Sequence, residues 1–338
     1  MKTYKSKEIV AEFSKGIIPA MKFDASADFD GWREKASAKL KELLGLPLTI
    51  CDDEFKITLI EENEEFKKIK FEFQSEKGYF IECEMLCPLK QEKPLPVAIC
   101  LQGHSSGKHI SLGYGRFKQD TEGYINRSNI AVQAVRNGYC AVAFDQRYMG
   151  IAGQDDKGNP ECMVTNAIFP TLLIGRTPIG ERVWDIQRMI DVLEKHLTEY
   201  IDPNKIICMG NSGGGTATFY AAALDERISL AVPSCAVCTF DASIIPISHC
   251  GCNYIPGIRN YFDMGDIGCL IAPRKLIVVN GDKDEIFPID GAKKSYRVIE
   301  SAYKKLGSDS NCEMVIGDGG HRFYGDDVWP VINRILNV

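Results

Sequence analysis

The chain has 338 residues, of which 45% are hydrophobic and 25% are charged, and its formal net charge is −6. This length and apolar content can build a sizeable core, in one large domain or two smaller ones. The weak negative charge, the lack of any block of like charges and the lack of a long apolar run argue against nucleic acid or a membrane as a partner.

The first 50 residues are predicted to form a helical extension. Apolar residues recur at helical spacing from Trp32 to Leu44, and a glycine and a proline then end the pattern. We therefore divide the chain into an N-terminal helical extension, residues 1–50, and a main domain, residues 51–338, which is expected to carry the function.

The main domain is predicted to begin with antiparallel strands and to continue with parallel strands. In KIKFEF (68–73) and YFIECEML (79–86), apolar and charged residues alternate, which predicts half-buried antiparallel strands. Helical patterns at 180–197 and 291–307 then separate short runs that are almost continuously apolar. These runs are VAICL (97–101), CAVAF (140–144), KIICMG (205–210), ISLAVP (228–233), KLIVVNG (275–281) and CEMVIG (312–317). Such runs between helices predict a parallel sheet in an α/β protein.

Two long segments, residues 146–180 and 235–272, follow neither periodicity and are rich in Gly, Pro, Tyr and Cys. Long insertions of this kind often form lids or pocket walls, so we expect lid-like insertions here, and which of the two covers a pocket is left open. Their arginines and tyrosines suit a polar ligand. The expected substrate-binding residues are Arg147, Arg176, Tyr254 and Arg259.

The pattern G-x-S-x-G occurs twice, as GHSSG at 103–107 and GNSGG at 210–214. It is typical of a nucleophilic serine on a sharp turn from a strand to a helix. Ser212 follows the apolar run KIICMG and precedes a helical stretch of small residues, whereas a glycine-rich loop follows Ser105. We therefore predict Ser212 as the nucleophile. The GHSSG loop is expected to supply a backbone N–H to an oxyanion.

Phosphate-binding and dinucleotide-binding loops also use closely spaced glycines. Thr216 occupies the lysine position of a phosphate loop that would begin at Gly210, and Ser212 occupies the second glycine of a dinucleotide loop. Both alternatives therefore lack the residue that the motif needs.

The general base is predicted from chain order. His321 follows the last apolar run in a glycine-rich loop, which is the place of the base in the order Ser, Asp, His. The acid is expected after the strand KLIVVNG, where Asp282, Asp284 and Glu285 are all candidates. Spacing alone does not choose among these three carboxylates.

With these motifs the chain resembles the α/β-hydrolase superfamily, in the branch of acetyl xylan esterase-like and dienelactone hydrolase-like serine esterases. In that superfamily the acid usually stands in G-x-x-D-x-x-x-P, which Gly281, Asp284 and Pro288 match. The resemblance therefore implies Asp284 as the acid. It also implies an oxyanion hole made by the backbone N–H groups of His104 and Gly213.

The resemblance covers roughly residues 65–338, and some family motifs differ. Carbohydrate acetyl esterases of this branch typically carry R-G-Q after the second parallel strand and a His-Glu pair at the base, where this chain has DQRYMG and HRF. Dienelactone hydrolases use a cysteine nucleophile, and this chain has a serine. The resemblance therefore implies esterase chemistry more strongly than it implies a substrate.

Together these observations predict an α/β-hydrolase fold: a mostly parallel twisted sheet with helices on both faces, an N-terminal helical extension and lid-like insertions. The predicted function is a serine carboxylic-ester hydrolase with a Ser212–His321–Asp284 triad and an acyl-enzyme, acting on short-acyl esters of a small polar or carbohydrate alcohol. Its partner is then a small-molecule ester, no cofactor is expected, and a homo-oligomer is left open. The alternatives are a peptidase of the same fold and a non-catalytic binding protein.

The cysteines predict a location and raise the question of a metal. Their number, 13, is odd, many lie inside apolar runs, and the first residues lack the apolar run of a signal peptide, so a cytoplasmic protein is predicted. SCAVC (234–238) and HCGC (249–252) contain ligand types for zinc, namely Cys235, Cys238, His249, Cys250 and Cys252. Because C-x-C is an uncommon partner for C-x-x-C, a cysteine-rich pocket wall is favoured and no metal is predicted. Trp184 is expected to pack on a helix face.

Overall fold

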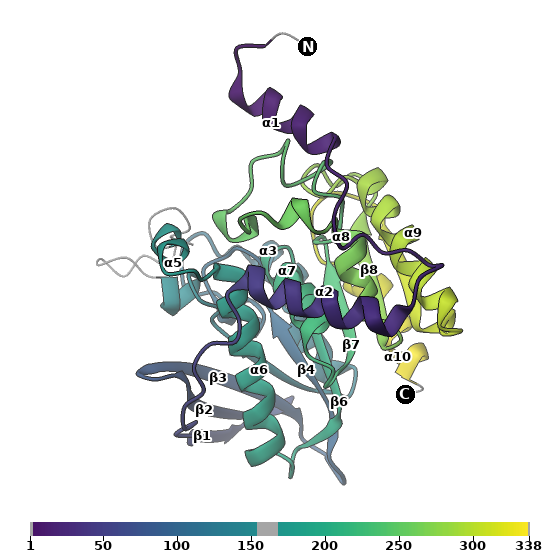
Figure 1. Ribbon diagram of the computed structural model, residues 1–338. Helices are drawn as coiled ribbons and strands as arrows, with labels where there is room; N and C mark the ends of the chain where they lie inside the picture. Colours follow the sequence, from purple (N-terminus) through teal and green to yellow (C-terminus); the bar gives the residue numbers. More distant parts are fainter. Residues whose placement is uncertain (1–2, 154–167, 337–338) are drawn as a thin grey trace.

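The computed structural model describes residues 3–153 and 168–336, which are built around a nine-stranded sheet (Figure 1). The strand order is β1-β2-β3-β5-β4-β6-β7-β8-β9. The pairs β1–β2, β2–β3 and β3–β5 are antiparallel, and all later neighbours are parallel. The strands are β1 (Lys56–Glu62), β2 (Phe66–Glu76), β3 (Tyr79–Pro88), β4 (Leu95–Leu101), β5 (Cys140–Phe144), β6 (Ile201–Asn211), β7 (Ile228–Ser234), β8 (Lys275–Gly281) and β9 (Cys312–Gly317).

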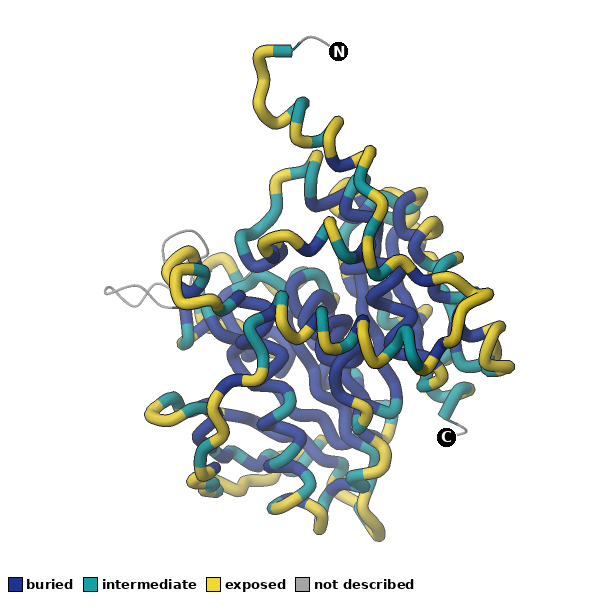
Figure 2. The backbone as a smooth tube through the Cα atoms, in the orientation of Figure 1, coloured by how far each residue is buried: buried dark blue, intermediate teal, exposed yellow. Residues whose placement is uncertain are grey.

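Helices bury both faces of the sheet. Side chains of α6, α7 and α9 belong to one core cluster and those of α4 and α10 to a second. Alternate residues of β4 join the two clusters, Ile99 the first and Cys100 the second, and Figure 2 shows the sheet as the buried centre of the molecule. The helices are α1 (Ser6–Lys15), α2 (Phe29–Leu44), α3 (Glu122–Ser128), α4 (Ile130–Arg136), α5 (Phe169–Leu173), α6 (Pro178–His196), α7 (Gly213–Leu224), α8 (Met264–Cys269), α9 (Ile289–Lys305) and α10 (Gly325–Leu336).

The N-terminal segment holds two helices with different surroundings. In Figure 1, α1 projects away from the sheet, while α2 lies across the helical layer in front of it. On the apolar side of α2, Ala36 and Leu40 are fully buried in the same cluster as α6 and α7. Gly45, with φ 75°, caps the C-terminal end of α2 in the left-handed conformation that favours glycine. The helical spacing of the sequence therefore reflects a face that α2 buries on the main domain.

The α/β fold predicted from the apolar runs is confirmed, since those runs form β4 to β9. β1 was not predicted. All but one of its residues are exposed, and a register shift between Ile57 and Leu59 interrupts its pairing with β2, so its apolar residues do not mark one buried face. Of the two expected insertions, 146–180 includes residues 154–167, which lie outside the described residues, and 235–272 is fully described. Among the described helices, none combines the length and the apolar character that crossing a bilayer requires.

Candidate active site

Ser212 lies at the sharp turn where β6 ends and α7 begins. Its φ of 54° and ψ of −119° are unusual for a residue with a side chain, so the surrounding structure must hold this strained conformation. The backbone N–H of Ser212 donates to the carbonyl of Ser234 at 2.8 Å, and the Thr216 N–H donates to the carbonyl of Ser212 at 2.8 Å. A Cβ on Gly214 would lie 2.2 Å from the Leu101 carbonyl oxygen, so only glycine lets α7 start this close to β4. The side chain of Ser212 remains partly exposed.

The other G-x-S-x-G match, GHSSG, lies in a loop after β4. Its Ser106 belongs to a cluster with His109 and Asp120, but this cluster is not arranged as a catalytic triad. Ser106 Oγ lies 3.0 Å from His109 Nε2, and Asp120 Oδ2 lies 2.8 Å from the same nitrogen. A triad needs the acid on one ring nitrogen and the nucleophile on the other, which this cluster does not offer. Asp120 also accepts the backbone N–H groups of Arg116 and Phe117, both at 2.9 Å. These contacts stabilise the loop that carries Ser105.

His321 and Asp284 meet at the carboxyl ends of β8 and β9. His321 Nδ1 lies 2.8 Å from Asp284 Oδ2, and the carboxylate is completely buried. Its second oxygen accepts the backbone N–H groups of Ile286 at 2.8 Å and Phe287 at 3.0 Å. Burial alone would raise the pKa of Asp284, but the hydrogen bonds from His321 and these two N–H groups outweigh it, and the pKa lies below its ordinary value. The carboxylate is therefore ionised at neutral pH.

The other acid candidates of this loop do not face His321. Asp282 accepts the backbone N–H of Gly319 at 2.7 Å, and its side chain is 43% exposed. Glu285 is exposed. Among the three carboxylates that the sequence left open, Asp284 is the one that the structure joins to the imidazole.

Ser212 and His321 line one cavity of about 360 Å³. His321 Nε2 is buried and has no hydrogen-bond partner among the described residues, so it is available to a group in the cavity. The other lining residues come from the loop after β4, the start of α7, the 235–272 insertion and the loop after β8: His104, Gly213, Thr216, Ser248, His249, Cys250, Asn253, Ile286 and Phe287. The second insertion therefore supplies a wall of this cavity.

His249, which the sequence analysis considered among possible zinc ligands, lines the wall of this cavity. Its Nε2 lies 3.0 Å from Ser243 Oγ, which in turn donates to the Ile286 carbonyl at 2.7 Å. Burial, helped by the nearby His321 and His104, lowers the pKa of His249 to about 4. The ring is therefore neutral at neutral pH and gives the cavity an uncharged polar wall.

His104 and Gly213, whose backbone N–H groups are expected to form the oxyanion hole, lie in contact with each other. Gly213 is the first residue of α7, where a backbone N–H has no acceptor within its own helix. A Cβ on Gly213 would lie 2.6 Å from Cε1 and 2.8 Å from Nδ1 of His104, so the imidazole rests directly on this glycine. His104 Nε2 lies 3.2 Å from Cys252 Sγ. The position of His104 is thus determined by α7 on one side and by the 235–272 insertion on the other.

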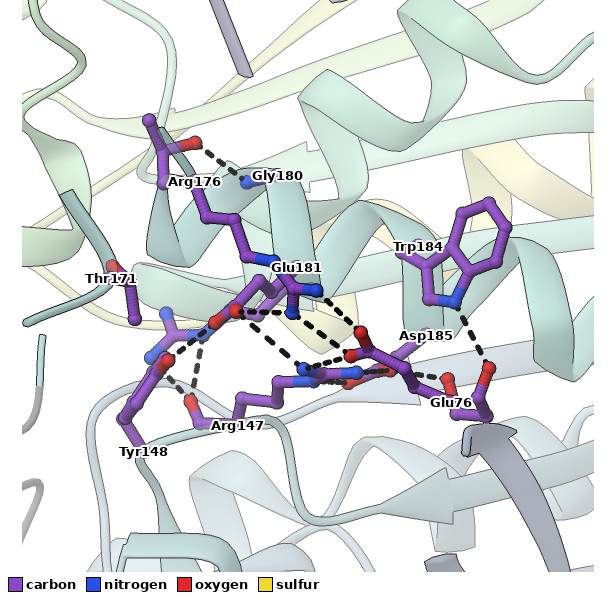
Figure 3. Close-up of polar contacts among 12 residues, drawn as sticks. Glu76, Arg147, Tyr148, Thr171, Arg176, Gly180, Glu181, Trp184 and Asp185 are labelled. Carbon is purple, nitrogen blue, oxygen red and sulfur yellow. Dashed lines mark hydrogen bonds and ion pairs between the residues drawn. The ribbon is translucent and has the colours of Figure 1, made fainter. Parts of the chain in front are cut away.

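The four expected substrate-binding residues do not line this cavity. Arg147 is buried and binds Asp185 through two nitrogens, at 2.9 and 3.0 Å, and Glu76 at 3.1 Å (Figure 3). Arg176 binds the same Glu76 at 2.6 Å. Arg259 pairs with Asp241 at 3.0 Å. The Tyr254 side chain is 43% exposed. The carboxylates around Arg147 and Arg176 make these arginines a link between β2 and α6.

Replacing Arg147 by methionine is expected to lower the free energy of unfolding by about 3–5 kcal/mol, because it leaves the buried Asp185 carboxylate without its partner. Arg176→Met is the matched control, since its side chain is 28% exposed and its loss should cost about 1 kcal/mol or less. Urea denaturation of both variants measures the difference. A large increase in KM for Arg147→Met with unchanged stability would show instead that Arg147 binds substrate.

The cysteines considered for zinc do not form one cluster. Cys235 Sγ lies 3.2 Å from the Arg322 carbonyl and close to Asp284 and His321, and Cys238 Sγ lies 3.5 Å from the Pro288 carbonyl. Neither approaches Cys250 or Cys252. Trp184 of α6 is buried, and its Nε1 donates to the Ser75 carbonyl of β2 at 3.0 Å.

Comparisons with known proteins agree with this fold. The model of the Abhydrolase family matches residues 2–306, a range that includes Ser212 and Asp284 and ends before His321. The candidate hydrolase YtaP of Bacillus subtilis (strain 168) is 26% identical over 247 residues, covering 72% of this chain and 77% of that protein.

Solved structures are similar over almost the whole chain. A candidate acetyl xylan esterase from Bacteroides fragilis NCTC 9343 has a TM-score of 0.83 at 18% identity, covering 99% of this chain and 96% of that chain. A glucuronoyl esterase from Solibacter usitatus has a TM-score of 0.71 at 16% identity, covering 95% of this chain and 97% of that chain. Since the family model spans most of the sequence and these structures share its fold, the chain belongs to the Abhydrolase family of α/β-hydrolases.

Proposed function

We propose that the protein is a serine esterase that hydrolyses small carboxylic esters through an acyl-enzyme. The observation that carries this proposal is the pairing of His321 with the buried Asp284 at 2.8 Å, with His321 Nε2 and the strained Ser212 facing one cavity. In the proposed mechanism, Ser212 Oγ attacks the ester carbonyl while His321 Nε2 takes its proton, and Asp284 stabilises the imidazolium.

The remaining steps use the same groups. The oxyanion of the tetrahedral intermediate accepts hydrogen bonds from the backbone N–H groups of Gly213 and His104. His321 then returns the proton to the alcohol, which leaves, and the acyl group stays on Ser212. A water molecule deprotonated by His321 releases the acid and restores the serine.

The size and lining of the cavity support a short acyl group and a polar alcohol. A volume of about 360 Å³ is small for a site that must hold both halves of an ester. Its walls include neutral polar groups on His249, Asn253 and Ser248, which suit hydroxyl groups better than a lipid chain. The names of two similar structures, an acetyl xylan esterase candidate and a glucuronoyl esterase, support an ester of a carbohydrate.

A series of p-nitrophenyl esters tests the proposed acyl pocket. We expect kcat/KM to be highest for acetate and to fall by about tenfold or more by octanoate, because a pocket that fits a short chain rejects added methylenes. Ser212→Ala serves as the blank for spontaneous hydrolysis. A maximum at octanoate would contradict a short-acyl pocket.

A fluorophosphonate probe separates the esterase from a binding protein with the same fold. Labelling of the wild-type chain that is lost in Ser212→Ala supports a reactive nucleophile. Absence of labelling in the wild type would favour a non-catalytic role, and rapid cleavage of peptide anilides with little ester hydrolysis would favour a peptidase.

A further inference from the structure

His104, Cys250 and Cys252 form a cluster of metal-binding side chains beside the proposed oxyanion hole. His104 Nε2 lies 3.2 Å from Cys252 Sγ, which lies 3.1 Å from Cys250 Sγ, and the three atoms all lie within 4.8 Å of one another. The C-x-C pair thus finds its third partner in a loop 148 residues away from Cys252, and not in the neighbouring C-x-x-C.

An imidazole nitrogen and two thiolates are a ligand set that Zn²⁺ prefers, and three protein ligands leave its fourth tetrahedral position open. With Zn–S bonds of about 2.3 Å, tetrahedral geometry places two sulfurs about 3.8 Å apart. The sulfurs of Cys250 and Cys252 would therefore have to separate by less than about 1 Å. Cys250 is partly exposed in a loop, and loops adjust more readily than strands or helices.

We propose that His104, Cys250 and Cys252 bind one thiophilic divalent cation, such as Zn²⁺, from the cavity that contains Ser212. His104 and Cys250 line this cavity, so an ion can reach them from solvent, and Cys252 lies buried behind them. On binding, the two thiols release their protons to solvent and the lone pair of His104 Nε2 completes the protein ligands. Asn253 Nδ2, 3.8 Å from Cys252 Sγ, is placed to support the thiolate.

The bound cation is expected to inhibit ester hydrolysis. This inhibition rests on the proposed function, whereas binding of the cation is independent of that function. The ion would stand in the wall next to Gly213 with its open position directed at the substrate cavity. An ion in this position would occupy space that the ester needs, which opposes entry of the substrate.

Titration of the reduced full-length protein with Co²⁺, a spectroscopic substitute for Zn²⁺, tests the site directly. We expect one Co²⁺ per chain, a near-ultraviolet thiolate-to-cobalt charge-transfer band, and loss of this band when Zn²⁺ is added. The band should disappear in Cys250→Ser and in Cys252→Ser. It should persist in the matched control Cys238→Ser, because Cys238 lies in the same insertion but contacts Pro288.

Activity measurements separate the site from the proposed function. A Zn²⁺ concentration about ten times the Kd should lower wild-type ester hydrolysis about tenfold, with recovery on chelation, and should leave Cys250→Ser almost unaffected. Ser212→Ala should lose activity and keep the cobalt band. A wild-type protein that binds Co²⁺ but hydrolyses no ester would reject the proposed function alone. An active wild type without the band, or with a band that survives both cysteine substitutions, would reject the metal site.

Discussion

Ser212→Ala is expected to lower kcat for ester hydrolysis by about 10⁴- to 10⁶-fold, since a triad without its nucleophile retains only binding and oxyanion stabilisation. The structure supplies the reason for choosing this serine. Ser212 is held at φ 54° between β6 and α7, with the first N–H of the helix beside it and His321 in the same cavity. Steady-state hydrolysis of p-nitrophenyl acetate measures the loss.

Ser105→Ala and Ser106→Ala are the matched controls, because both serines belong to the first motif, GHSSG. Ser105 lies in the loop after β4, and Ser106 shares a single ring nitrogen of His109 with Asp120. We expect each change to lower kcat by about tenfold at most. Ser106→Ala is also expected to lower the free energy of unfolding, because it removes a buried hydrogen bond. A severe loss in Ser105→Ala together with an active Ser212→Ala would transfer the nucleophile to the first motif.

The parts of the fold that sequence predicted are those in which burial controls residue choice. β4, β5, β7 and β8 are almost entirely buried, so their residues are mostly apolar in short runs, and α2 shows its buried stripe at helical spacing. β1 has no such constraint, because all but one of its residues are exposed. It is held by backbone pairing with β2, and its apolar Leu59 and Ile60 are exposed, so no buried face identifies the strand.

The proposed catalytic residues could be selected because chain order and turn chemistry are local properties. The strained turn at Ser212 needs glycines at fixed positions, and the base must follow the last strand. Choosing Asp284 over Asp282 needed the resemblance to a family. The structural distinction is the pair of N–H groups from Ile286 and Phe287 that orient the Asp284 carboxylate, and that loop geometry is not encoded in spacing.

Charge partners and distant clusters could not be read from the sequence. The sequence analysis predicted Arg147 as a substrate-binding residue. In the structure its guanidinium charge is paired with the carboxylates of Glu76, from β2, and Asp185, from α6. Cys252 seemed to belong with nearby cysteines, and instead contacts His104. In both cases the partner is distant in sequence and becomes a neighbour only when the sheet order is known.

Asp284→Asn is expected to lower kcat/KM about 10⁴-fold, somewhat less than the loss of the nucleophile. The amide has nearly the shape of the carboxylate, and its oxygen can still accept the N–H groups of Ile286 and Phe287. Its nitrogen then faces Nδ1 of His321 and donates a hydrogen bond. That contact favours the tautomer that carries its proton on Nε2, so the imidazole can no longer accept the proton of Ser212.

Asp282→Asn is the matched control, since it makes the same chemical change two residues earlier in the same loop. The Asp282 side chain is 43% exposed and accepts the Gly319 N–H at 2.7 Å, a contact that the amide oxygen can keep. We expect kcat/KM for p-nitrophenyl acetate to change by about twofold or less, because no reacting group contacts this carboxylate. If Asp282→Asn is severe and Asp284→Asn is mild, the acid is Asp282, and the contact between Asp284 and His321 serves the structure of the loop and not the reaction.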